Sequence, residues 1–159
     1  MEESIKKEKL SIVENDKLIQ PGLIDFINMQ MDISGINVNT LSPLALAFIG
    51  DGVYDLVIRT MVVEQGNIPV KDMHKKCSAL VKASAQARLY RDIKDELTTK
   101  EAAIFKRGSN AKSKTYAKNA SKFNYRIATG FETLIGYLYL TNDFSRILEL
   151  IKIGLEKRQ

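Results

Sequence analysis

The sequence of 159 residues contains only one cysteine and one histidine. A single cysteine, Cys77, excludes an internal disulfide and a cysteine-built zinc site. Because His74 is the only histidine, a site made of His and Cys ligands is excluded as well. Any bound metal should therefore be a hard cation held by carboxylate oxygens. We expect Cys77 to act as a small apolar filler.

Long hydrophobic segments are also missing. No apolar run reaches the length of about 18 residues that a membrane span needs. The N-terminal sequence MEESIKKEKL has no apolar stretch like that of a secretory signal. We therefore expect a cytoplasmic protein without a membrane partner. The composition, 45% hydrophobic and 27% charged, is ordinary for a globular protein, and a chain of this size can bury one core.

Positive charge is concentrated in one part of the chain. Residues 71–126 hold 15 basic and 5 acidic side chains, a net charge of +10, whereas the whole chain carries +5. An excess of this size in one segment predicts a polyanionic partner, and nucleic acid is the first candidate.

Helical periodicity dominates and no segment shows sustained strand alternation, so we predict an all-α fold. Ser42 and Pro43 are a typical N-cap and first residue of a helix, which should run to about Gln65 and stop at Gly66. Further helices are expected, in chain order, at 70–96 (one helix or two), from Thr98 or Thr99 to near Gly108, at 125–141 and at 143–157.

The ends and the basic middle of the chain are expected to be less regular. Residues 1–38 should form an N-terminal extension whose first dozen residues are disordered, with a weak helical pattern over 17–31. A linker is expected at 32–41, and the main domain at 39–159. The stretch 108–124 is polar, basic and rich in small residues, which predicts a loop.

Two of the predicted helices carry an acid within an otherwise apolar sequence. Asp51 lies in AFIGDGVYD, and Glu132 lies in YRIATGFETLIGYLYL. Small residues beside both acids, Gly50 and Gly136 among them, allow two helix backbones to approach closely. We expect the helices to pack together and to bring Asp51 and Glu132 to one place in the core. A divalent cation would remove the repulsion between the two carboxylates, and oxygen ligands suit Mg²⁺.

Each of these residues also has a plainer interpretation. Asp51 could be a salt-bridge partner of Arg59 or Lys82 rather than a metal ligand. Asp55 is either a third ligand or part of the solvated edge of its helix. His74 could contact phosphate or act as a general acid, but a lone histidine beside two lysines is more often a surface residue.

Three segments resemble the nuclease domain of the ribonuclease III family. LALAFIGDGVYDLVIR resembles its signature helix, FETLIGYLYL its second acidic helix, and KRGSNAKS the Arg-Gly segment between them. The match covers residues 40–155. Ala47 and Thr129 stand where typical members have two further carboxylates. This reduction to two acids, the segment DMHKKCSALVKASAQ and the expected lack of a double-stranded-RNA-binding domain are similar to the Mini-ribonuclease III branch.

The resemblance implies an all-α homodimer that cuts double-stranded RNA with Mg²⁺, and in this branch the substrate is the precursor of the large-subunit (23S) ribosomal RNA. Asp51 and Glu132 would be the catalytic residues and the metal ligands, holding one Mg²⁺. A ribosomal protein that presents the RNA is a candidate second partner. The basic residues expected to bind RNA are Lys75, Lys76, Lys82, Lys106, Arg107, Lys112, Lys114, Lys118, Lys122 and Arg126.

Two other functions are compatible with these residues, and the lysine-rich stretch has a second interpretation. The same fold could serve a non-catalytic RNA-binding or ribosome-assembly protein, or a helical DNA-binding regulator, although the latter would need a basic recognition helix. The lysine-rich stretch could be only a solvated surface. A dimer interface is expected among surplus apolar residues of the last two helices, namely Tyr137, Leu138, Leu140, Phe144, Ile147 and Ile151.

Overall fold

The computed structural model describes residues 21–112 and 121–158, and all regular secondary structure within these ranges is helical. The chain divides into two compact units between Gly35 and Ile36. In the first unit, helix α2 spans Leu23–Gln30 and has no buried residue. It falls within the segment predicted to be weakly helical. The expectation for the first dozen residues lies outside the described ranges.

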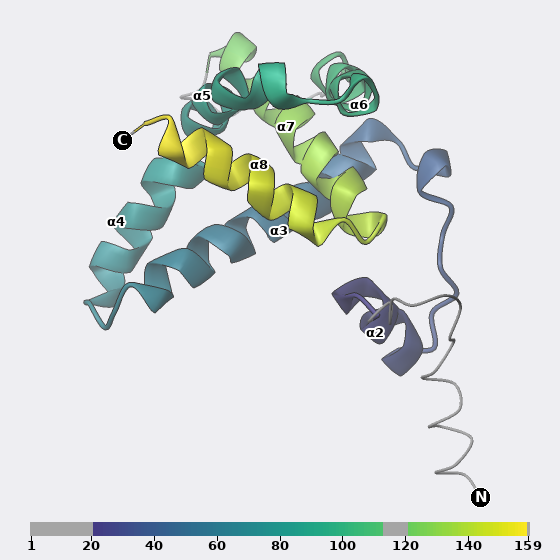
Figure 1. Cartoon of the computed structure of the whole chain (residues 1–159), viewed down its shortest axis with the longest axis horizontal. Helices are drawn as coiled ribbons and strands as arrows, with labels where there is room; N and C mark the ends of the chain where they lie inside the picture. The colour runs from purple at the N-terminus through teal and green to yellow at the C-terminus, as the bar shows by residue number, and fades with distance from the viewer. Residues whose placement is uncertain (1–20, 113–120, 159) are drawn as a thin grey trace, which may run out of the picture. The chain divides into compact units, whose positions relative to one another are not determined.

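The second unit is built from packed helices, as predicted (Figure 1). None of the helices in the described ranges combines the length and hydrophobicity needed to cross a bilayer. The elements of this unit, in chain order, are η1 (Val38–Thr40), α3 (Pro43–Glu64), α4 (Val70–Val81), α5 (Ala83–Ile93), η2 (Lys94–Glu96), α6 (Thr99–Ser109), α7 (Lys122–Leu140) and α8 (Phe144–Glu156).

The capping residues confirm two of the predicted helix starts. The Ser42 side chain accepts a hydrogen bond from the Ala45 N–H, and Pro43 occupies the first turn of α3. Thr98 and Glu101 form a reciprocal capping box at the start of α6. These side chains satisfy backbone donors that have no partner within the helix, which fixes where each helix begins.

The structure decides one boundary that the sequence leaves open and corrects another. The stretch 70–96 contains two helices, separated at Lys82, where the backbone is extended. Helix α7 begins at Lys122 rather than at residue 125, because the Ser121 side chain accepts a hydrogen bond from the Asn124 N–H. The predicted loop at 108–124 is therefore too long at both ends, and its residues 113–120 are not described.

Helices α3 and α7 form the centre of the unit, and α7 also packs on α5, α6 and α8. Two glycines allow the central pair to meet backbone to backbone. A Cβ on Gly50 would overlap the Glu132 carbonyl oxygen, and a Cβ on Gly136 would overlap the Leu46 carbonyl oxygen. The core around this contact is apolar; its fully buried large side chains include Tyr54, Ile58, Leu89, Phe131, Leu134, Ile135, Ile147 and Leu150.

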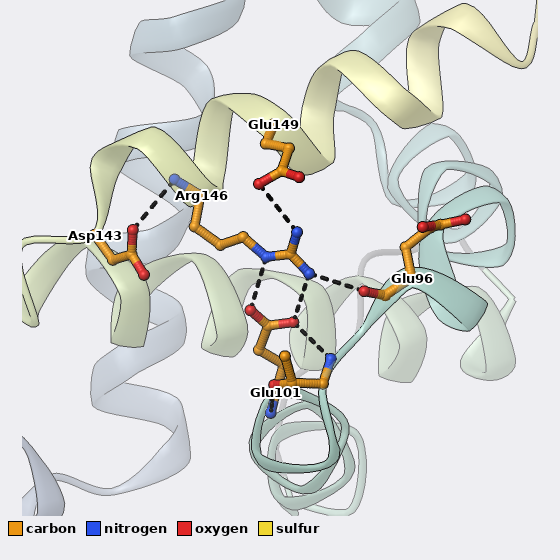
Figure 2. A network of polar contacts seen from close by, with 6 residues as sticks. Glu96, Glu101, Asp143, Arg146 and Glu149 are labelled. Atoms are coloured by element: carbon orange, nitrogen blue, oxygen red, sulfur yellow. Dashed lines mark hydrogen bonds and ion pairs between the residues drawn. The ribbon is translucent and has the colours of Figure 1, made fainter.

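An arginine clasp joins α8 to the start of α6 (Figure 2). Arg146 donates from Nε to Glu101 Oε1 at 2.9 Å and from Nη2 to Glu101 Oε2 at 3.0 Å. Its Nη2 also donates to the Glu96 carbonyl at 2.8 Å, and its Nη1 pairs with Glu149 at 3.1 Å. These bonds to Arg146 hold the pKa of the Glu101 carboxyl below its usual range. The clasp therefore anchors the N-terminal end of α6.

Replacing Arg146 should destabilise the second unit. The Glu101 side chain is only 9% exposed, so Arg146→Met would leave a desolvated carboxylate with only the bonds from Thr98. We expect the free energy of unfolding in urea to fall by about 2–3 kcal/mol. The matched control on α8 is Lys152→Met, because the ion pair of Lys152 with Glu156 is exposed. That control should change stability by less than about 0.5 kcal/mol, and an equal loss in both variants would contradict the clasp.

Candidate active site

Asp51 on α3 and Glu132 on α7 lie together where the two central helices cross. The Gly50 backbone abuts the Glu132 carbonyl, which places the residue after Gly50 beside Glu132. The charge of Asp51 acts on the Glu132 carboxyl and raises its pKa, as expected of two carboxyl groups that lie close together. The structure thus brings the two acids to one place, as the sequence analysis expected.

The expectation that both acids lie in the core is wrong for Asp51, which is exposed. Helix α3 presents a whole face to solvent that includes Phe48, 84% exposed, and the exposed Leu44 and Leu56. A helix that is apolar nearly all round predicts burial on every side, but here one apolar face is left uncovered. Glu132 is the more buried member of the pair.

Burial and charge make the free Glu132 carboxyl hard to ionise. Desolvation is the main cause that raises its pKa, to about 8, and the nearby charge of Asp51 adds to the shift. A hydrogen bond donated by Gln86 Nε2 to Glu132 Oε1, at 3.1 Å, acts in the opposite direction. A site that penalises its own negative charge in this way favours a bound cation.

The other acid and the lone histidine are placed differently. Asp55 accepts a hydrogen bond from Arg59 Nε at 2.7 Å in an exposed pair, so the predicted Arg59 partner serves Asp55. His74 is exposed on α4. Cys77 is buried in the core, as expected of an apolar filler.

The donor set fits a hard divalent cation with an incomplete protein shell. In the described ranges, no group of three or more His, Cys, Asp or Glu residues could hold a metal. Two carboxylates alone suit Mg²⁺, which usually keeps several waters and binds through one or two carboxylates plus substrate phosphate. The charge of Asp51 raises the pKa of Glu132, and a bound cation would relieve this unfavourable interaction.

The predicted RNA-binding residues that the structure describes are all exposed, on α4, α6 and α7 and next to them. Lys114 and Lys118 lie outside the described residues. Arg126 also has a structural contact: its Nε donates to the Ser109 carbonyl at 3.0 Å, and its Nη2 to Asn110 Oδ1 at 3.2 Å. Arg126 therefore joins the end of α6 to the start of α7.

Gln86, which was not predicted from the sequence, is a buried amide that contacts Glu132. One signal was available in the sequence. Gln86 is a polar residue among the small and apolar positions of ASAQARLY, which form the inner face of α5. A buried polar residue of this kind needs a partner, and its partner is Glu132.

Comparison with known proteins places the chain in a family. The ribonuclease III domain matches residues 44–143. The Mini-ribonuclease 3 of Clostridium tetani is 48% identical over 118 residues, covering 74% of this chain and 78% of that protein. The chain belongs to the Mini-ribonuclease III branch of the ribonuclease III family.

A second relative and a solved structure extend the match over nearly the whole length of each. The Mini-ribonuclease 3 of a Thermoanaerobacter species is 42% identical over 138 residues, or 87% of this chain and 97% of that protein. The crystal structure of protein FN1578 from Fusobacterium nucleatum has a TM-score of 0.70 at 29% identity, covering 79% of this chain and all of that one. The chain therefore has the ribonuclease III nuclease fold and is an endoribonuclease of a family that acts on double-stranded RNA with a divalent metal.

The raised pKa of Glu132 predicts a pH-dependent stability in the absence of metal. The folded protein holds a proton on Glu132 up to about pH 8, whereas the unfolded chain releases it near 4.5. Stability should therefore fall as pH rises through this window, by on the order of 3–4 kcal/mol. Urea unfolding in EDTA from pH 5.5 to 8.5 measures it. Glu132→Gln should flatten the profile, and equal slopes in the two proteins would contradict the assignment.

Proposed function

We propose that the chain is a Mg²⁺-dependent endoribonuclease that matures the ends of precursor 23S ribosomal RNA. The observation that carries the proposal is the contact between Asp51 and Glu132, two acids from different helices whose repulsion a divalent cation would relieve. The preference for the large-subunit precursor rests on membership of the Mini-ribonuclease III branch.

Asp51 and Glu132 would hold the ion from two sides, one exposed and one largely buried. When bound, Mg²⁺ supplies Lewis-acid stabilisation of phosphate charge and lowers the pKa of water. The exposed Asp51 faces the solvent side, from which an RNA strand can approach. Glu132, held by Gln86, fixes the inner side of the site. The expected products carry 5′-phosphate and 3′-hydroxyl ends.

RNA affinity would come from the surface of the nuclease domain itself. Lys106 and Arg107 in the last turn of α6 and Lys112 just beyond it are exposed, as is Lys122 at the start of α7. The bonds of Arg126 hold these two helix ends together, so their charges form one basic surface. Point charges of this kind bind the phosphates of A-form RNA with little sequence choice.

The uncovered face of α3 supports a homodimer. Phe48, Leu56 and Val63 are more than half exposed on one side of this helix, beside Asp51. Pairing of two copies through this face would bury these side chains and bring two acid pairs to one RNA duplex, one for each strand. The interface predicted on the last two helices is less suitable, because Leu138, Ile147 and Ile151 are buried within the chain.

A cleavage assay tests the proposal directly. The full chain should cut duplex RNA, including a duplex from the end of precursor 23S RNA, with Mg²⁺ and not with EDTA. Single-stranded RNA and duplex DNA at equal salt serve as controls. Binding of duplex RNA without cleavage would favour the non-catalytic ribosome-assembly alternative. Cleavage only after addition of a ribosomal protein would identify that protein as the second partner.

A further inference from the structure

Gln86 is a buried amide at the edge of the acid pair. It lies in the first turns of α5 and is 1% exposed. Its Nε2 donates two hydrogen bonds, to Glu132 Oε1 at 3.1 Å and to the Val81 carbonyl at 3.0 Å. The amide therefore links Glu132 to the end of α4.

The main chain fixes which end of the amide faces Glu132. Helix α4 ends at Val81 because the Lys82 backbone is extended, and the Ala85 N–H bonds to the Lys82 carbonyl. The Val81 carbonyl accepts a hydrogen bond from the Gln86 side chain. Of the two ends of that amide, only the nitrogen can donate it. Glu132, bonded to the same nitrogen, is thus held by a donor and never meets the amide oxygen.

Gln86 has both a stabilising and a destabilising effect on the fold: its nitrogen satisfies the Val81 carbonyl, but its oxygen is left without a partner among the described residues. The Gln86 Oε1 atom is buried and has no hydrogen-bond partner in the described part of the chain. A buried acceptor without a partner destabilises a fold, and this offsets part of what the hydrogen bond to the Val81 carbonyl contributes. The hydrogen bond to Glu132 is the feature of Gln86 that acts on the acid pair.

We propose that Gln86 is a positioning residue that holds the Glu132 carboxyl group in place against Asp51 before the ion and the RNA arrive. The inference rests on the proposed function, in which Asp51 and Glu132 hold a divalent cation. Residues that hydrogen-bond a metal ligand orient it, and their removal commonly lowers metal affinity or activity by about 10- to 100-fold.

Gln86→Met tests this role, because methionine keeps the length of the side chain and removes the donor. We expect kcat on duplex RNA to fall about 10- to 100-fold with KM for RNA unchanged. Mg²⁺ binding, measured by calorimetry on the RNA-free protein, should weaken in the same range, and raising Mg²⁺ should recover part of kcat. A solely structural role would lower melting temperature without changing Mg²⁺ binding.

Leu89→Met is the matched control, because Leu89 is buried on the same helix and faces Gly154 of α8. This control should keep the Mg²⁺ affinity and kcat of the wild type. A folded Gln86→Met protein with wild-type Mg²⁺ affinity and kcat would overturn the inference. Should that variant not fold, Gln86→Asn, which withdraws the amide by one methylene, is expected to change both quantities in the same direction. Failure of the wild type itself to bind Mg²⁺ or to cut would instead overturn the proposed function.

Discussion

Asp51→Asn should abolish cleavage of duplex RNA while leaving its binding intact. The substitution keeps the size of the side chain and removes the exposed charge that would face the ion, so we expect kcat to fall on the order of 10³-fold or more. The charge of Asp51 raises the pKa of Glu132, so its loss should leave the metal-free fold as stable as before or slightly more stable. Cleavage, filter binding of the same duplex and urea unfolding measure the three quantities.

Asp55→Asn is the informative control for Asp51. It removes the same charge one helical turn further along α3, where the carboxylate is already engaged by Arg59. We expect its kcat to stay within a few-fold of the wild type. Unfolding of Asp51→Asn would indicate that Asp51 has a structural role, and equal loss of activity in both variants would make Asp55 part of the site.

Gly50→Ala should prevent the two central helices from packing. The added Cβ would overlap the Glu132 carbonyl oxygen and lie 2.7 Å from the Gly136 nitrogen. Both obstacles are main-chain atoms of α7, so no side-chain rotation can relieve them. We expect the free energy of unfolding to fall by more than about 4 kcal/mol, or the folded state to be lost.

Gly52→Ala is a close control, two residues further along the same helix. A Cβ there meets no atom within 4 Å, and the position is exposed. Alanine in a helix interior should stabilise this variant by about 0.5–1 kcal/mol. Unfolding curves in urea compare the two variants directly. A loss of stability in both variants would mean that α3 needs glycine for its own backbone conformation and not for the contact with α7.

The helices were predictable from the sequence because short-range signals define them. Ser42 with Pro43, and Thr98 with Glu101, fix two helix starts through local hydrogen bonds that neighbouring residues determine. The break at Lys82 carries no glycine or proline, so the sequence over 70–96 is compatible with one helix or two. Gln86 satisfies the Val81 carbonyl there and also reaches Glu132, 46 residues away.

The meeting of Asp51 and Glu132 was also predictable, because small residues beside each acid favour close packing of their helices. How deeply each acid is buried was not predictable from the sequence. An apolar helix face that awaits a partner has the same composition as a face turned to the core, so Phe48 and Leu56 suggested burial although they are exposed. Single-chain periodicity cannot distinguish the two cases.

The glycine contact between α3 and α7 has a consequence for engineering the protein. With no side chain between Gly50 and Glu132, the spacing of the two helices at this level is set by main-chain van der Waals contact. Core redesign elsewhere, for instance around Ile147 or Leu150 to raise thermal tolerance, can then change packing without altering the reach between the two carboxylates. Main-chain contact, rather than side-chain packing, therefore sets the spacing of the two helices that carry the acids.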